Sequence, residues 1–267
     1  MVMNMKILIT GASGGIGFLT GLVLAQRGHY VIMTTHTKKQ EVVLKEKISS
    51  LGYSNVVVEK LDITNSYDIE KFKKFDIDVL INHAGIGVGG SIIDLDIDSL
   101  RYNFEVNFFS SYNLAKIFLN NLISNNKSGK LIITSSIAGT IPFEFLGSYC
   151  SSKAAITMMA RVLKDEIKYL DRNIKISVVE PGAYKTGFNK VMIDSANDSI
   201  EEDSPFFDKK EEIYDILKLK FSLASLHSLK SIVTQIVLAV EEDNKKFIYS
   251  SPFIQRMFKK IYALLKY

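Results

Sequence analysis

Cysteine is almost absent from this sequence, since Cys150 is the only one among 267 residues. An internal disulfide needs two cysteines, so none can form, and the composition fits a reducing compartment. The first eleven residues, MVMNMKILITG, are too short and too soon interrupted by polar residues for a secretion signal. We therefore expect a cytoplasmic protein.

Long apolar runs and strong charge are also lacking. No stretch approaches the roughly 18 consecutive apolar residues of a membrane-spanning helix. The formal net charge of +4 is small for the length, and it gives no case for nucleic-acid binding, which usually needs a clustered basic face. Hydrophobic residues nevertheless make up 47% of the chain, enough for a large core.

Short β-branched runs alternate with longer helical patterns along most of the chain. The expected strands are 5–10, 30–35, 55–61, 77–85, 129–136, 174–182 and 246–251. The expected helices are about 15–27, 38–52, 65–74, 98–124 and 150–170, and a regular pattern returns at 213–242. Strands separated by helices of this length predict right-handed βαβ units. We predict one α/β domain over 1–267, a doubly wound parallel sheet of about seven strands with helices on both faces.

A glycine-rich turn, ITGASGGIG, follows the first expected strand and opens the first expected helix. Gly11, Gly15 and Gly17 do not have the G-x-G-x-x-G spacing, and glycines alone can mark a tight turn. Their place at the start of a βαβ series favours a Rossmann-type site, where backbone N–H groups and the helix N-terminus face a pyrophosphate.

The end of the second strand bears on the choice between NAD and NADP. An acidic side chain there would bond the adenosine ribose and repel a 2′-phosphate. The sequence has no carboxylate at this point, and His36, Lys38 and Lys39 can neutralise a phosphate. The lysines can equally be solvated residues at a helix start. We favour NADP, with NAD as the alternative.

Tyr149 and Lys153 lie four residues apart in an expected helix, and so on one of its faces. A free tyrosine has a pKa of about 10, and a nearby cation lowers that pKa by favouring the phenolate. On an ordinary helix such a pair is usually exposed on the surface and has no catalytic role. Beside a dinucleotide site it predicts a proton donor and acceptor for hydride chemistry.

Several motifs occur along the chain in the same order as in one protein family. They are TGASGGIG (10–17), LDIT (61–64), NHAG (82–85), NFEVNFFS (103–110), SSIAG (135–139), YCSSK (149–153) and EPGAYKTGF (180–188). Over about 5–186 the chain resembles a short-chain dehydrogenase/reductase, and its last two motifs resemble the branch of 17β-hydroxysteroid and retinol dehydrogenases. His83 departs from the N-N-A-G form of the family.

The resemblance implies roles for particular residues. Tyr149 would be the general acid or base, Lys153 would also bond the nicotinamide ribose, Ser136 would hold the substrate oxygen, and Asn107 would anchor a proton-relay water. Ser135 is the rival for the serine role, but its spacing from Tyr149 fits less well. The implied cofactor-binding residues are Gly11, Ser13, Gly15, Ile16, Gly17, His36, Asp62, Ile63, Asn82, Ala84, Gly85, Tyr149, Lys153, Pro181, Gly182 and Thr186. No metal site is predicted.

The function that follows is an NADP-preferring oxidoreductase for a steroid-, retinoid- or lipid-like alcohol or ketone. Reduction of small or acyl-chain carbonyl compounds, a non-catalytic redox sensor and sugar-nucleotide chemistry are the alternatives. The polar segment 187–212 is either a disordered loop or, as we favour, part of a substrate lid over about 187–225. The candidate pocket residues are Phe143, Phe145, Leu146, Phe188 and Met192.

The tail, about 252–267, predicts an amphipathic basic helix. It can dock on the body, pair with another subunit or touch an anionic membrane surface. We favour docking or pairing, because amphipathic helices commonly complete a core. The resemblance also implies a homodimer or homotetramer formed through the helices at about 98–124 and 150–170.

Overall fold

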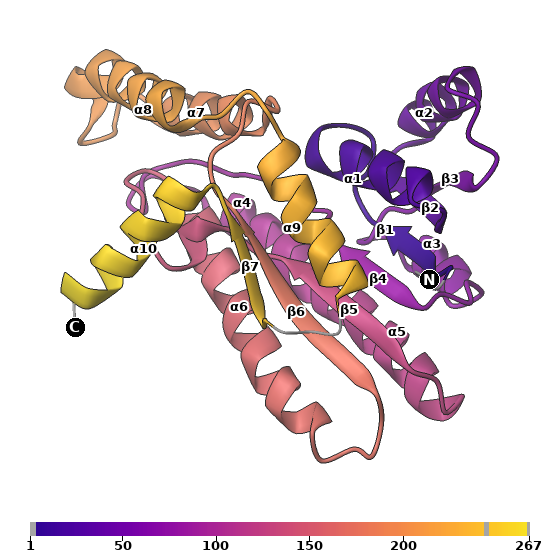
Figure 1. The fold of residues 1–267 in the computed structure, drawn as a ribbon. Coiled ribbons are helices and arrows are strands. Elements are labelled where there is room, and N and C mark those ends of the chain that lie inside the picture. The colour runs from indigo at the N-terminus through magenta and orange to yellow at the C-terminus, as the bar shows by residue number, and fades with distance from the viewer. Residues whose placement is uncertain (1–3, 243–245, 266–267) are drawn as a thin grey trace.

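The computed structural model describes residues 4–242 and 246–265. Its centre is one sheet of seven parallel strands in the order β3-β2-β1-β4-β5-β6-β7 (Figure 1). The strands are β1 Lys6–Ile9, β2 Tyr30–Thr35, β3 Val56–Lys60, β4 Val79–Asn82, β5 Gly129–Thr134, β6 Ile174–Pro181 and β7 Ile248–Ser251. All seven lie at the predicted places, and the doubly wound fold is confirmed.

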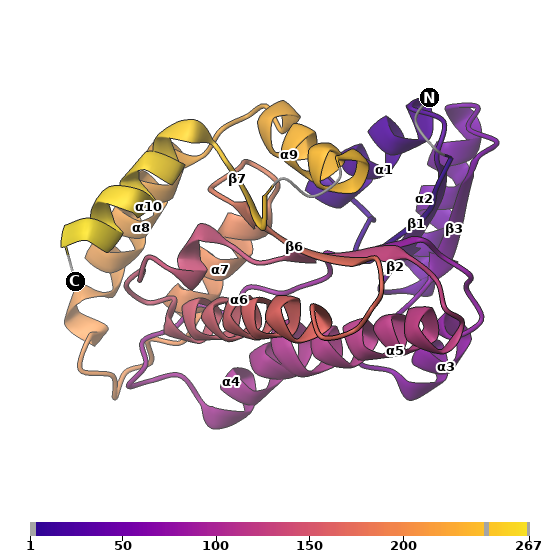
Figure 2. The same cartoon turned by 60° about the horizontal axis from the view of Figure 1, so that its bottom comes forward.

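Helices cover both faces of the sheet, which is why the strands are apolar on both sides. One core cluster packs α1 Gly15–Gln26, α2 Lys38–Ser50 and α9 Lys230–Glu241 against one face. The other packs α3 Ser66–Phe72, α5 Ser111–Ser124 and α6 Gly147–Ile167 against the opposite face. Figure 2 shows the two layers on either side of the strands.

The order of the strands reverses between β1 and β4, which are neighbours in the sheet. In sheets of this kind the crevice beyond the carboxyl ends of the strands at such a reversal is where ligands bind. The loops after β1 and β4 carry the glycine-rich turn and the NHAG motif. The fold therefore brings these two motifs to one edge.

The predicted helix 98–124 is interrupted in the structure. Residues Ile97–Phe104 form α4, Glu105–Ser110 form a π-helical segment, and α5 follows. The carboxamide of Asn107 accepts a hydrogen bond from the Ile86 N–H at 2.9 Å and donates one to the Ile86 carbonyl at 2.9 Å. This tie to the loop after β4 accompanies the wider turn, and such turns are frequent at functional sites.

The segment 187–212 is more regular than the sequence predicts. It contains α7, Phe188–Asp198, whose buried residues are Met192, Ile193 and Ala196. The pattern at 213–242 divides into α8 Lys210–Ala224 and α9, because Ser225 is extended and Leu226 pairs with Tyr184 in a short parallel bridge.

The last helix, α10, spans Phe253–Leu265. It begins where the tail was predicted to become helical, and 266–267 lie outside the described residues. Within 4–242 and 246–265, no helix has the length and apolar character needed to cross a bilayer.

Candidate active site

A cavity of about 1090 Å³ lies at the carboxyl edge of the sheet. Its walls include the loops that follow strands β1 to β6, the start of α6, and α7 and α8. Most of the predicted site residues line it: Gly11, Ser13, Gly15, Ile16, His36, Asp62, Ile63, Ala84, Gly85, Ser136, Tyr149, Lys153, Pro181, Gly182 and Thr186. Gly17, Asn82 and Asn107 are not among the lining residues.

The glycine-rich turn is shaped for a close approach. Gly11 has a φ of +69°, and a Cβ there would lie 2.9 Å from the Cα of Ala84, so a side chain would collide with backbone. No side chain caps the start of α1 at Gly14, and its first turn carries no acid. An uncapped helix start with exposed backbone N–H groups suits a phosphate group.

Tyr149 lies in the cavity wall with 8% of its surface exposed. Its ring centroid is 5.7 Å from that of Phe188 in α7. Burial raises the pKa of Tyr149 to about 12, against an opposing effect of the Ser136 hydroxyl. In the protein alone the phenol is therefore protonated at neutral pH, ready to donate.

Lys153 is 4% exposed and donates a hydrogen bond to the carbonyl of Thr134 at 3.1 Å. Its ammonium lies 5.8 Å from the centroid of the Tyr149 ring. Burial lowers the pKa of Lys153 to about 8. In the protein alone, desolvation is the largest influence on the pKa of Tyr149.

The two serines after β5 differ in their surroundings. The Ser135 hydroxyl contacts the Thr157 hydroxyl at 2.5 Å and donates to the Lys153 carbonyl at 3.1 Å, so it is engaged with α6. The Ser136 hydroxyl accepts a hydrogen bond from Ala138 N–H at 3.1 Å and lies near the phenol of Tyr149. This placement favours Ser136 over Ser135 for contact with a substrate.

Asn107 and Asn82 lie behind the cavity wall. Besides Ile86, the Asn107 amide donates to Asn103 at 2.8 Å and to Ser152 at 3.1 Å. The Asn82 amide donates to the carbonyl of Ser111 at 2.7 Å. Asn107 thus holds the cavity-lining backbone of Ile86 in place, and Asn82 joins the end of β4 to the start of α5.

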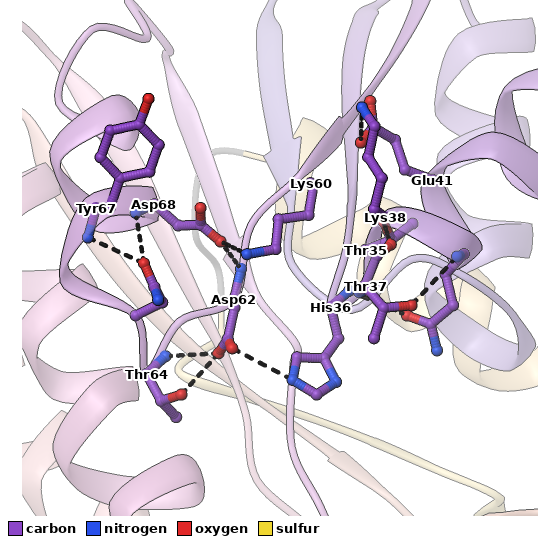
Figure 3. Close-up of polar contacts among 12 residues, drawn as sticks. Thr35, His36, Thr37, Lys38, Glu41, Lys60, Asp62, Thr64, Tyr67 and Asp68 are labelled. Carbon is purple, nitrogen blue, oxygen red and sulfur yellow. Dashed lines mark hydrogen bonds and ion pairs between the residues drawn. The ribbon is translucent and has the colours of Figure 1, made fainter.

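At another part of the cavity wall, the His36 ring contacts the Asp62 carboxylate, with 3.3 Å between Nε2 and Oδ2 (Figure 3). Asp62 also accepts hydrogen bonds from Thr64. Lys38 and Lys39 are both exposed, and Lys38 is paired with Glu41 at 2.8 Å. Of the three predicted cations, only His36 lines the cavity.

Some lining residues were not predicted from the sequence. His83 lines the cavity, with Nδ1 3.2 Å from the Thr134 hydroxyl, and only its departure from N-N-A-G singled it out. Gln255 of α10 also contributes, and no local signal could have shown it. Phe145 was expected in the pocket but packs instead on Phe206, with centroids 5.4 Å apart.

Comparison with known proteins gives the family. The model of the short chain dehydrogenase family matches residues 5–196. The uncharacterized oxidoreductase YusZ of Bacillus subtilis is 35% identical over 191 residues, 69% of this chain and 67% of that protein. The 3-ketodihydrosphingosine reductase of Bacteroides thetaiotaomicron is 31% identical over 188 residues, 68% of this chain and 65% of that protein.

A solved structure agrees in fold. A short-chain dehydrogenase/reductase from Burkholderia phymatum, in complex with NAD, superimposes with a TM-score of 0.80 at 17% identity, covering 97% of this chain and 93% of that one. With the motifs assembled around one cavity and the family model matching more than half of the sequence, this chain belongs to the short-chain dehydrogenase/reductase family.

Proposed function

We propose that this protein is an NADP-preferring oxidoreductase that interconverts a hydrophobic alcohol and its ketone. The observation that carries the proposal is that one cavity holds both the uncapped glycine turn and the buried Tyr149–Lys153 pair. A relative at 31% identity is named a 3-ketodihydrosphingosine reductase, and a structural neighbour contains NAD; both support this class of reaction.

The shape of the glycine turn fits a dinucleotide. Gly11 has a positive φ and lies against Ala84, so no side chain covers the backbone at this point of the turn. The start of α1 lines the cavity through Gly14, Gly15 and Ile16. A bound nicotinamide would supply the hydride. The residues of this chain would hold its phosphates at α1 and its nicotinamide end near Thr186, which lies close to Gly15.

Proton transfer then falls to Tyr149. Its protonated phenol lies beside the Ser136 hydroxyl, so the two can hold one carbonyl oxygen while Tyr149 donates the proton in reduction. In the oxidation direction the phenol must first lose its proton, which burial opposes. Lys153 is the nearby group whose positive charge would favour the phenolate, and its position depends on the Thr134 carbonyl.

The substrate end of the cavity is apolar. Phe143, Leu146, Phe188 and Met192 line it, and Phe143 packs on Phe221 of α8 with centroids 6.2 Å apart. Helices α7 and α8 would serve as the substrate lid. Such a wall favours a lipid-, steroid- or retinoid-like carbonyl over a small polar one.

The preference for NADP rests on the end of β2. No carboxylate follows Thr35 there, and His36 presents a ring that is 60% exposed. Lys38 is paired with Glu41 and does not line the cavity, so the proposed NADP preference depends on His36 more than on Lys38. The Asp62 carboxylate competes with a 2′-phosphate for the His36 ring.

One kinetic assay tests the function and the preference together. We expect the purified protein to oxidise NADPH with hydrophobic ketones, with kcat/KM for NADPH about tenfold or more above that for NADH. His36→Asp should reverse this ratio, because the new carboxylate would repel the 2′-phosphate; Lys38→Asp is the matched control. Absence of turnover with every steroid, retinoid and aliphatic ketone tested would refute the proposed activity.

A homo-oligomer is the further part of the proposal. In the predicted interface, Phe109 and Met158 are 52% and 60% exposed, which supports pairing through the helices around α5 and α6. Phe118 and Ile156, on the same two helices, are buried in the core at 3% and 1%, so they pack against the sheet and are not available for pairing.

A further inference from the structure

The helix α10 turns its polar side toward the protein. Gln255 accepts a hydrogen bond from Ala183 N–H at 2.8 Å and donates one to the Ala224 carbonyl at 2.7 Å. The Lys259 ammonium pairs with the carboxylate of Glu180, which is 1% exposed. Hydrogen bonds and a buried ion pair therefore hold this helix in place.

Helix α10 lies at the outer edge of the molecule (Figures 1 and 2), and its apolar side is exposed. Its exposed apolar residues are Phe253 62%, Ile254 67%, Met257 47%, Ile261 48% and Leu264 81%. At about 100° per residue these five fall within an arc of roughly 100°, opposite Gln255 and Lys259. An amphipathic helix of a globular protein usually buries this stripe. The tail therefore docks on the body as we favoured, but through its polar side, and these apolar residues do not complete the core.

Two cations border the apolar stripe. The Arg256 guanidinium lies 5.0 Å from the centroid of the Phe253 ring, and Lys260 is exposed. The sequence from 253 to 265 contains no Asp or Glu. Lys259 is neutralised by Glu180, so Arg256 and Lys260 give the outer surface its charge. Apolar residues beside cations, on a helix without acidic residues, are typical of helices that lie on anionic lipid.

We propose that the outward face of α10 binds the surface of an anionic lipid bilayer, with the helix lying in the plane of the interface. A second copy of the chain fits less well. The stripe runs along a helix about 20 Å long and about 10 Å wide, on the order of 200 Å², whereas a stable dimer needs about 800 Å² from each partner. Antiparallel pairing of two such helices would also bring Arg256 and Lys260 of both copies to the same side.

The proposed surface adjoins the cavity. Gln255, on the inner side of α10, is one of the cavity-lining residues, and its bond to Ala224 joins the start of α10 to the end of α8. Docking through the outer side would hold the cavity close to the lipid phase, where hydrophobic substrates concentrate. Lipid binding itself does not depend on turnover and can be measured without a substrate.

The test uses the full chain and point variants. Deleting α10 would leave Glu180 buried without its partner and would destabilise the fold. We expect wild type to sediment with vesicles of phosphatidylglycerol and phosphatidylcholine, and far less with phosphatidylcholine alone. Ile254→Glu with Ile261→Glu should weaken this binding about tenfold or more. The matched control, Val42→Glu with Val43→Glu, changes two exposed residues of α2 by the same charge and should bind like wild type.

Lys260→Glu tests the electrostatic contribution to vesicle binding. This variant should bind anionic vesicles more weakly than wild type, and added salt should weaken the binding of wild type in the same way. Equal binding of wild type and the Ile254→Glu, Ile261→Glu variant, with both folded by circular dichroism, would overturn the proposal. The proposal would also be overturned if wild type does not bind the vesicles but forms an oligomer that the Ile254→Glu, Ile261→Glu variant cannot form. That result would show that the outward face of α10 binds a second copy of the chain.

Discussion

Replacing Tyr149 by Phe should lower the rate of ketone reduction by about a thousandfold or more while NADPH still binds. The substitution removes one hydroxyl from a ring that is 8% exposed and packed on Phe188, so the cavity keeps its shape. It also removes the group placed to give the proton, and general acids contribute about 10² to 10⁴ in rate. Single-turnover kinetics and a fluorescence titration with NADPH measure the two effects separately.

Tyr249→Phe is the matched control for that result. Tyr249 is 1% exposed in β7 and is not among the cavity-lining residues. Its substitution removes a buried hydroxyl outside the cavity and should leave turnover unchanged. Full activity of Tyr149→Phe would remove Tyr149 from the reaction. Loss of NADPH binding in that variant would instead show that the Tyr149 hydroxyl helps to hold the cofactor.

Replacing His83 by Asn should make the protein more resistant to acid. Burial, with a smaller effect of the Lys153 charge, lowers the pKa of His83 to about 4. The unfolded value of this pKa is about 6.5, so the folded protein takes up the proton less readily than the unfolded chain. The contribution of neutral His83 to the free energy of unfolding is therefore fully present above about pH 6.5 and is lost as the pH falls through about 4. Because the ring borders the cavity, where water screens its charge, we expect a loss on the order of 2 kcal/mol.

Urea unfolding at about pH 7 and about pH 4.5 measures this difference. The free energy of unfolding should fall more steeply with acid in wild type than in His83→Asn. Carboxylates titrate over the same range in both proteins and cancel in the comparison. Lys153, whose pKa is about 8, is already charged throughout it. Equal acid sensitivity of the two proteins would show that His83 stays solvated.

Local patterns predicted the strands and the motif positions well. The run YVIMTT is β-branched and bounded by polar residues, and it forms β2 at Tyr30–Thr35 as expected. Tyr149 and Lys153 both reach the cavity because one helical turn separates them. The glycine-rich segment forms the predicted turn. Gly11 has a positive φ and lies so close to the backbone of Ala84 that only glycine fits there.

Features that depend on distant contacts could not be predicted. Helix α7 fits only because Gly87 lacks a side chain, since a Cβ there would lie 2.2 Å from Cγ of Met192. The amphipathic pattern of the tail predicted α10, but its outward apolar face depends on Glu180, far away in β6. The high pKa of Tyr149 likewise follows from burial by α7, which spacing within α6 does not reveal.

The most direct test of the central claim is the ionisation of Tyr149 itself. Tyrosine labelled with ¹³C at Cζ reports each phenolate by nuclear magnetic resonance, and Tyr149→Phe identifies the signal among the 12 tyrosines. Without cofactor, the signal should stay that of a protonated phenol until the pH nears 12, as the raised pKa requires. With oxidised NADP bound, the pKa should fall by roughly 1–3 units, and less in Lys153→Met. The same titration curve with and without the cofactor would contradict the account.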